Sequence, residues 1–272
     1  MTSIGISVSP IKSQFGPLLF SGDLFYGLEQ IKKYGYDGVE LSLLDSQAVD
    51  QDSIMKKLDQ LGLSVFAIAT GQTYVTDGCG LYSYYEDKRK KALGRLFQHI
   101  DFAARLNCSV IIGGIRGKVE DASDDFAETQ KKGDGAAAEC AHYGEEKGVT
   151  LLIEPINRYE TNVINRLDQG LELISTIESE HLKLLPDTYH MNIEERSLEK
   201  SILGAGASID YIHFADSNRM APGWGHIDFS QIIAALKEIA YDGHIGVEIL
   251  PQPDHHQAAQ QAIQFLRGIV DF

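Results

Sequence analysis

The sequence predicts a single α/β domain over residues 1–272, folded as one (β/α)8 TIM barrel, and three observations favour this fold. Short apolar runs alternate with longer amphipathic segments along the whole chain. The apolar runs are continuous, which is typical of parallel strands covered on both faces. Eight such units in 272 residues match the usual size of a closed barrel.

The predicted strands are the runs richest in β-branched and apolar residues. In chain order they span residues 4–10, 38–44, 65–70, 109–115, 151–156, 182–188, 211–217 and 245–250. Between them, segments 23–36, 86–107 and 228–243 repeat apolar residues at helical spacing, with charge on the other face. An open doubly wound sheet is the structural rival. No G-x-G-x-x-G follows the first strand, however, and "GAGA" at 204–207 lacks a preceding strand.

Composition and charge restrict the class of protein. No run approaches the roughly 18 apolar residues of a membrane span, and the first residues lack the features of a signal peptide, so we expect a cytoplasmic protein with no membrane partner. The formal net charge of −15 disfavours nucleic acid as a partner, because binding to a polyanion requires a basic face. Cys79, Cys108 and Cys140 are odd in number and lack C-x-x-C spacing, which argues against a disulfide framework or a thiolate zinc site.

Acidic and imidazole side chains stand near the ends of the last four predicted strands. They are, in order, Glu154, Asp187, His213 and Glu248. In a TIM barrel the carboxyl ends of the strands meet on one face, and this face carries the active site. Three carboxylates and one neutral imidazole suit a divalent ion such as Mn²⁺, Mg²⁺, Co²⁺ or Zn²⁺. The sequence therefore predicts a metal site in the mouth of the barrel.

The motifs around these residues resemble those of a known family. "EPINRYE", "PDTYHMN", "HFADSNR", "PGWGHIDF" and "VEIL" are similar, in order and spacing, to the xylose-isomerase-like TIM-barrel superfamily and its D-tagatose and D-psicose 3-epimerase branch. The resemblance implies that the four strand-end residues bind one divalent metal, usually manganese. It implies contacts with substrate oxygens from His190, Arg219 and Glu160. It also implies a homo-oligomer, either a dimer or a tetramer, acting on a small sugar or sugar acid.

The chemistry of the strand-end residues favours the same reaction. A divalent cation that holds a carbonyl and a neighbouring hydroxyl stabilises the enolate formed when the adjacent carbon loses a proton. Epimerisation through a cis-enediolate then needs one acid/base group on each face of the plane. Glu154 and Glu248 come from strands on different sides of the wall and are the predicted pair. Asp187 and His213 are predicted to serve mainly as ligands.

Two other enzyme activities and a non-catalytic function stay open at this point. The same metal and glutamates suit aldose–ketose isomerisation, as in the hydroxypyruvate and inosose isomerases of the superfamily, if the proton returns to a different carbon. A nuclease related to endonuclease IV needs three metals, more histidines and a basic face, which the charge of −15 disfavours. A non-catalytic sugar-binding barrel leaves two opposed glutamates around a metal unexplained.

Arg116 is the predicted determinant of substrate class. The loops "GQTYVTDGCGLY" and "GGIRGK" depart from the free-sugar epimerases and are similar to a branch that acts on keto-aldonates such as 5-keto-L-gluconate. Arg116 follows an apolar strand and lies between glycines, so we expect it at the barrel rim, where its planar guanidinium suits a carboxylate or phosphate. The alternative is a salt bridge from Arg116 to Glu120 or Asp121.

Overall fold

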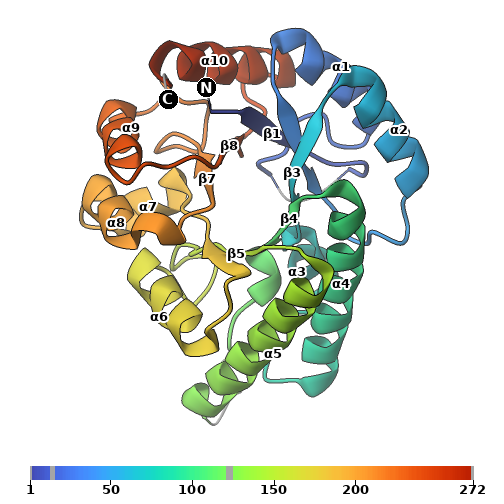
Figure 1. The fold of residues 1–272 in the computed structure, drawn as a ribbon, viewed down its shortest axis with the longest axis vertical. Coiled ribbons are helices and arrows are strands. Elements are labelled where there is room, and N and C mark those ends of the chain that lie inside the picture. Colours follow the sequence, from blue (N-terminus) through green and yellow to red (C-terminus); the bar gives the residue numbers. More distant parts are fainter. Residues whose placement is uncertain (1, 13–15, 121–124, 271–272) are drawn as a thin grey trace.

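Eight parallel strands form a barrel in the computed structural model, which describes residues 2–12, 16–120 and 125–270 (Figure 1). The strands are β1 (Ile4–Val8), β2 (Gly38–Ser42), β3 (Ser64–Ala69), β4 (Ser109–Ile112), β5 (Leu151–Ile153), β6 (Leu182–Leu184), β7 (Tyr211–Phe214) and β8 (His244–Val247). Each strand from β1 to β5 pairs with the next, and β8 lies between β1 and β7. Parallel bridges from Leu184 to Ile209 and from Asp187 to His213 join the two ends of this sheet. The prediction of a (β/α)8 barrel is confirmed.

Helices surround the barrel and cover the outer face of its strands (Figure 1). The α-helices of the described residues are α1 (Leu24–Tyr34), α2 (Gln51–Leu61), α3 (Gly71–Asp77), α4 (Glu86–Leu106), α5 (Phe126–Lys147), α6 (Leu167–Ile177), α7 (Thr188–Glu194), α8 (Leu198–Ala205), α9 (Phe229–Glu238) and α10 (His255–Ile269). Segments 23–36, 86–107 and 228–243, predicted as helical, contain α1, α4 and α9. None of the helices in the described ranges is long and apolar enough to cross a membrane.

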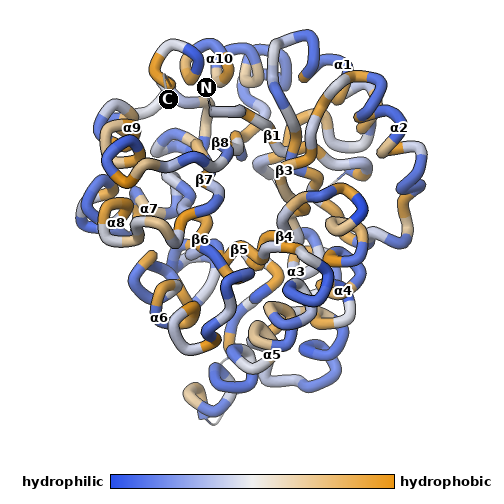
Figure 2. The backbone as a smooth tube through the Cα atoms, viewed as in Figure 1, coloured by the Kyte–Doolittle hydropathy of each residue, from blue (hydrophilic) through white to orange (hydrophobic). Residues whose placement is uncertain are grey.

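Acidic N-caps start several helices where the chain turns away from the barrel. The side chains of Asp50, Asp228 and Asp254 accept hydrogen bonds from the first backbone N–H groups of α2, α9 and α10. Apolar residues gather on the strands and on the helix faces that meet them, while hydrophilic residues lie outside (Figure 2). Burial of this shared apolar layer stabilises the barrel.

The observed strands end earlier than the sequence predicts. Residues 113–115, predicted as the end of a strand, lie outside β4. A short 3₁₀ turn spans Gly114–Arg116 instead. β5 ends at Ile153 and β8 at Val247, directly before Glu154 and Glu248. The chain beyond the last paired residue can therefore direct side chains inward over the end of the barrel.

Candidate metal and substrate site

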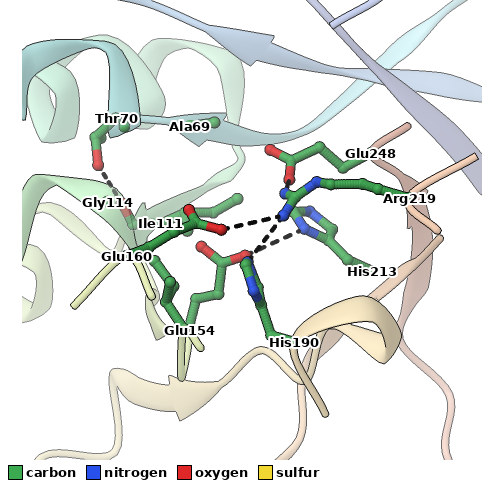
Figure 3. Close-up of a pocket in the computed structure, with 12 residues that line it drawn as sticks. Ala69, Thr70, Ile111, Gly114, Glu154, Glu160, His190, His213, Arg219 and Glu248 are labelled. Carbon is green, nitrogen blue, oxygen red and sulfur yellow. Dashed lines mark hydrogen bonds and ion pairs between the residues drawn. The ribbon is translucent and has the colours of Figure 1, made fainter. Parts of the chain in front are cut away.

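The four predicted strand-end residues meet at one point. Glu154 directly follows β5, Asp187 lies between β6 and α7, His213 is in β7, and Glu248 directly follows β8. All four are buried, and each offers a ligand atom within 4.8 Å of the others (Figure 3 labels three of them). The structure thus brings together the whole set that the sequence singles out.

Two buried atoms of this cluster have no hydrogen-bond partner in the described structure. They are Asp187 Oδ2 and His213 Nδ1, which lie 3.7 Å apart. The other oxygen of Asp187 is used, because Oδ1 caps α7 by accepting from the backbone N–H of Tyr189 at 2.7 Å. A buried polar atom without a partner is costly, and a cation bound among these atoms would remove that cost. The donor set of three carboxylates and one imidazole fits a divalent ion.

Burial and neighbouring charges shift the acid–base behaviour of the cluster. Burial raises the pKa of Glu248 to about 8 despite the opposing charge of Arg219, and it raises the pKa of Glu154 as well. Burial alone would lower the pKa of His213, but Glu40 and the other carboxylates around it raise the pKa well above its ordinary value. Protons and a divalent cation would therefore compete for these groups.

Arg219 extends over the cluster from the loop after β7. Its guanidinium donates to Glu248 Oε2, and its Nη1 lies 3.2 Å from His190 Nε2 and 3.8 Å from Glu160 Oε1 (Figure 3). Arg219 has a φ of 60°, which is unusual for a residue other than glycine. The buried carboxylate of Asp216 holds this loop, because it accepts from three backbone N–H groups, those of Ser217, Gly223 and Ile227.

His190 lies in the first turn of α7, directly after the Asp187 cap. Burial lowers the pKa of His190 to about 3, so its imidazole is neutral. The backbone N–H of Asn157 and the side-chain Nδ2 of the same residue approach His190 Nδ1 at 3.4 and 2.7 Å. Asn157 Nδ2 also donates to Glu160 Oε1 at 2.8 Å. The segment after β5 therefore positions the histidine as well as Glu160.

A cavity lies over these side chains. Its polar side is formed by residues of the cluster together with His190, Arg219 and Glu160. Ala69, Thr70, Ile111 and Gly114 lie opposite Arg219 and Glu248 (Figure 3), and Gly71 and Ile156 complete the lining. A small molecule with one oxygen-rich end would match this division.

Two glycines make room for the cluster. A Cβ atom on Gly113 would lie 2.0 Å from Glu154 Oε2, and one on Gly246 would lie 2.8 Å from Cδ2 of His213. Any larger residue at Gly113 would displace a carboxylate whose position the cluster requires.

Glu40 is a site residue that the sequence analysis missed. Its carboxylate is fully buried in β2, where Oε2 lies 2.6 Å from His213 Nε2 and Oε1 accepts from Ser7 Oγ at 2.7 Å. A signal was present, because Glu40 is a charged residue inside an otherwise apolar predicted strand. A buried carboxylate in such a position requires a specific partner.

The expectation for Arg116 is corrected by the structure. Its side chain is 1% exposed and does not emerge at the rim. Its guanidinium donates to the backbone carbonyls of Ile112, Glu154 and Ile164, which joins the chain after β4 to the loop after β5. The alternative salt bridge to Glu120 is also absent from these contacts, and Asp121 lies outside the described residues. The carbonyls of Ile112 and Ile164 also accept from the backbone N–H groups of Glu154 and Ile156, so Arg116 adds a second donor to each of them.

Comparisons with known proteins agree with this geometry. A family model described as xylose isomerase-like TIM barrel matches residues 28–269. An L-ribulose 3-epimerase from Methylomonas sp. (strain DH-1) is 32% identical over 79% of this chain and 74% of its own length. A ketose 3-epimerase from Arthrobacter globiformis is 31% identical over 82% of this chain and 76% of its own. A solved structure of L-ribulose 3-epimerase superposes with a TM-score of 0.84 at 27% identity, covering 99% of this chain and 95% of that one.

Proposed function

We propose that this chain, which belongs to the xylose isomerase-like TIM-barrel family, epimerises a ketose with the help of one divalent metal ion. It is an enzyme of the epimerase and isomerase class, as its similarity to named 3-epimerases indicates. The observation that carries the proposal is the buried cluster of three carboxylates and one imidazole under a small, half-apolar cavity. A cytoplasmic location and a homo-oligomeric state, dimer or tetramer, stay predictions.

The metal would be held by Glu154, Asp187, His213 and Glu248, with Mn²⁺ favoured over Mg²⁺, Co²⁺ and Zn²⁺. When bound, such an ion supplies a Lewis acid that stabilises negative charge on substrate oxygens. Hard carboxylate oxygens with a single imidazole favour manganese or magnesium over softer ions. The unpartnered atoms of Asp187 and His213 support this assignment.

Glu154 and Glu248 would move the proton. One glutamate removes a proton from the carbon next to the substrate carbonyl, and the other returns a proton to the opposite face of the planar enediolate. Their entry from β5 and β8 supports a placement on two sides of the substrate. The raised pKa of both carboxyls supports a role in proton transfer, because an acid/base group works best when its pKa lies near the working pH.

His190, Arg219 and Glu160 would bind the substrate oxygens. All three line the same cavity as Glu154, His213 and Glu248. Arg219 can donate bidentate hydrogen bonds, and Glu160 accepts from hydroxyl groups. Their convergence on one small volume would hold the reacting carbon between the two glutamates.

A neutral ketose is favoured over a keto-aldonate or a sugar phosphate. The keto-aldonate expectation had two grounds, the likeness of two loops to a keto-aldonate branch and Arg116, and the guanidinium of Arg116 is occupied by backbone carbonyls. Among the residues that line the cavity in the described structure, Arg219 is the one Lys or Arg, and it is already paired with Glu248. The rest of the lining, which includes Ile111, Ile156 and Thr70, carries no positive charge to pair with a second anionic group.

Aldose–ketose isomerisation is the second candidate reaction. It is favoured by the family itself, and it would use the same glutamates with the proton returned to a neighbouring carbon. Incubating the purified protein with Mn²⁺ and a panel of ketoses, keto-aldonates and sugar phosphates in D₂O tests both reactions. We expect a ketose epimer that carries deuterium at the inverted carbon. An aldose product would establish the isomerase, and failure to turn over any ketose would contradict the proposal.

A further inference from the structure

We infer that Glu40 and Asn157 hold both site histidines in the Nε2–H tautomer, so that the two rings present opposite chemistry to the cavity. His213 would turn the lone pair of Nδ1 toward the proposed metal. His190 would turn the N–H of Nε2 toward the proposed substrate oxygen. The inference rests on the proposed function and assigns two positioning residues to it.

The tautomer of His213 follows from Glu40. A carboxylate accepts hydrogen bonds and cannot donate them, so His213 Nε2, at 2.6 Å from Glu40 Oε2, carries a proton. Ser7 Oγ donates to the other oxygen of Glu40 at 2.7 Å and so helps to fix the orientation of the carboxylate toward His213. The lone pair of Nδ1 is then left facing Glu154 Oε1 at 3.5 Å and Asp187 Oδ2 at 3.7 Å. Three acceptors around one point favour a positive charge between them, which is the proposed metal ion or, in its absence, a second proton on the ring.

The tautomer of His190 follows from Asn157. A backbone N–H can only donate, and that of Asn157 points at His190 Nδ1 at 3.4 Å. The side-chain amide agrees, because its Nδ2 donates to the same nitrogen at 2.7 Å and to Glu160 at 2.8 Å. The orientation of the Asn157 amide is fixed by its oxygen, because Oδ1 accepts from the backbone N–H of Tyr159 at 3.0 Å. Nδ1 of His190 is therefore an acceptor, and the proton resides on Nε2.

This assignment places two donors face to face. The Nε2–H of His190 lies 3.2 Å from Nη1 of Arg219, and a guanidinium nitrogen also can only donate. Two N–H groups at this distance gain no hydrogen bond from one another, but both can donate to an oxygen that binds between them. Asn157 would thus keep His190 ready to bind an oxygen without touching the substrate itself.

The part of the inference that concerns Glu40, the Glu40 half, is tested by metal binding and needs no turnover. Titration of the chelator-treated protein with Mn²⁺ should show affinity roughly 10- to 100-fold weaker in Glu40→Gln than in the wild type, as is usual when the partner of a metal-ligating histidine is changed. Asp134→Asn is a matched control, because Asp134 is a part-buried carboxylate bonded to Tyr82 and lies on α5, outside the cluster. Ser7→Ala should weaken Mn²⁺ in the same direction by a smaller factor and serves if Glu40→Gln does not fold. Unchanged Mn²⁺ affinity in the folded variants would overturn this half.

The Asn157 half is tested by the ring nitrogens themselves. In Zn²⁺-loaded, ¹⁵N-labelled protein, NMR correlations from the ring protons should show the proton on Nε2 of both histidines. Asn157→Asp replaces a donor with an acceptor and should move the proton of His190 to Nδ1, with a loss of roughly 10- to 100-fold in kcat/KM. Asn162→Asp makes the same change in the same loop, at a side chain that bonds the backbone of Val119, and should alter neither quantity.

Other outcomes separate this inference from the proposed function. A wild-type His190 with its proton on Nδ1, or an unchanged tautomer in Asn157→Asp, would overturn the Asn157 half even if the enzyme epimerises ketoses. Conversely, the tautomers and the Mn²⁺ titration can agree with the inference in a protein that turns over no ketose, because neither measurement uses a substrate.

Discussion

Glu154 and Glu248 enter the same cavity from β5 and β8, and burial raises the pKa of both. Glu154→Gln and Glu248→Gln keep the shape of each side chain but remove its ability to accept a proton. We expect each variant to lose turnover by at least ~10²-fold, while one of them still exchanges the substrate proton with D₂O from its own face. Glu128→Gln, an exposed change on α5, is the control. Near-normal turnover in either site variant would show that the two-base assignment is wrong.

Gly113 is required at its position because the carboxylate of Glu154 occupies the space beside it. A methyl group there would lie 2.0 Å from Glu154 Oε2, so Gly113→Ala must displace the carboxylate. We expect it to weaken Mn²⁺ binding and to lower kcat/KM by at least ~10-fold. Gly135→Ala in α5 is the matched control, because no heavy atom lies within 4 Å of the added carbon, and we expect a slight stabilisation. Wild-type Mn²⁺ affinity in Gly113→Ala would contradict the role of Glu154 as a ligand.

At the scale of elements, Arg116 joins the ends of two strands. Its guanidinium donates to three backbone carbonyls in the segments after β4 and β5, and its side chain is buried. Arg116→Met would remove all three of these hydrogen bonds, although the carbonyls of Ile112 and Ile164 keep a backbone donor. We therefore expect the free energy of unfolding in urea to fall by about 2 kcal/mol. Because the role is structural, KM for ketoses and keto-aldonates should change by the same factor. A selective loss for keto-aldonates would instead support Arg116 as a substrate anchor.

Helix α4 carries a histidine that makes the fold sensitive to acid. His99 is fully buried, and neither ring nitrogen has a hydrogen-bond partner in the described structure. Burial lowers the pKa of His99 to about 4, against roughly 6.5 in an unfolded chain. The unfolded state binds the proton more readily, so stability is full above pH 6.5 and falls by about 3 kcal/mol as the pH drops to 4.

His99→Leu tests this origin of the acid sensitivity. Removing the titrating ring should make the urea unfolding free energy less dependent on pH between 6.5 and 4, while the value at pH 7 changes little or rises. The measurement compares urea curves of both proteins at pH 7 and pH 5. An equal pH slope in the variant and the wild type would assign the effect to other groups.

For the whole molecule, the metal should link activity to stability. The cluster draws side chains from the ends of four strands, so an ion bound there stabilises the closed barrel over the unfolded chain. Chelation should abolish activity and lower the Tm, and Mn²⁺ at 100 times its Kd should restore about 2.7 kcal/mol. The double variant Glu154→Gln, Asp187→Asn should show no such stabilisation. Full activity after exhaustive chelation, with no metal left by elemental analysis, would refute the metal-dependent mechanism.

Much of the barrel and of the cluster could be predicted because both follow from local patterns in the sequence. Continuous apolar runs mark strands covered on both sides, and their number marks a barrel. Since parallel strands end on the same face, polar residues at successive strand ends must converge. The residues at these strand ends are Glu154, Asp187, His213 and Glu248, and the structure places them together.

The positions of Arg116 and Glu40 were decided only by the tertiary structure, because they depend on contacts between segments that are distant in the sequence. The sequence predicts Arg116 at the rim of the barrel, yet its guanidinium is buried and donates to backbone carbonyls of the segments after β4 and β5. Glu40 lies 173 residues from His213 in the chain, and only closure of the barrel brings β2 and β7 within hydrogen-bond distance. The sequence by itself determined which residues reach the mouth of the barrel, because strand order and direction settle that. Which of them face the cavity and which satisfy the backbone was decided by three-dimensional packing, because each buried polar group takes the nearest partner that the closed fold offers.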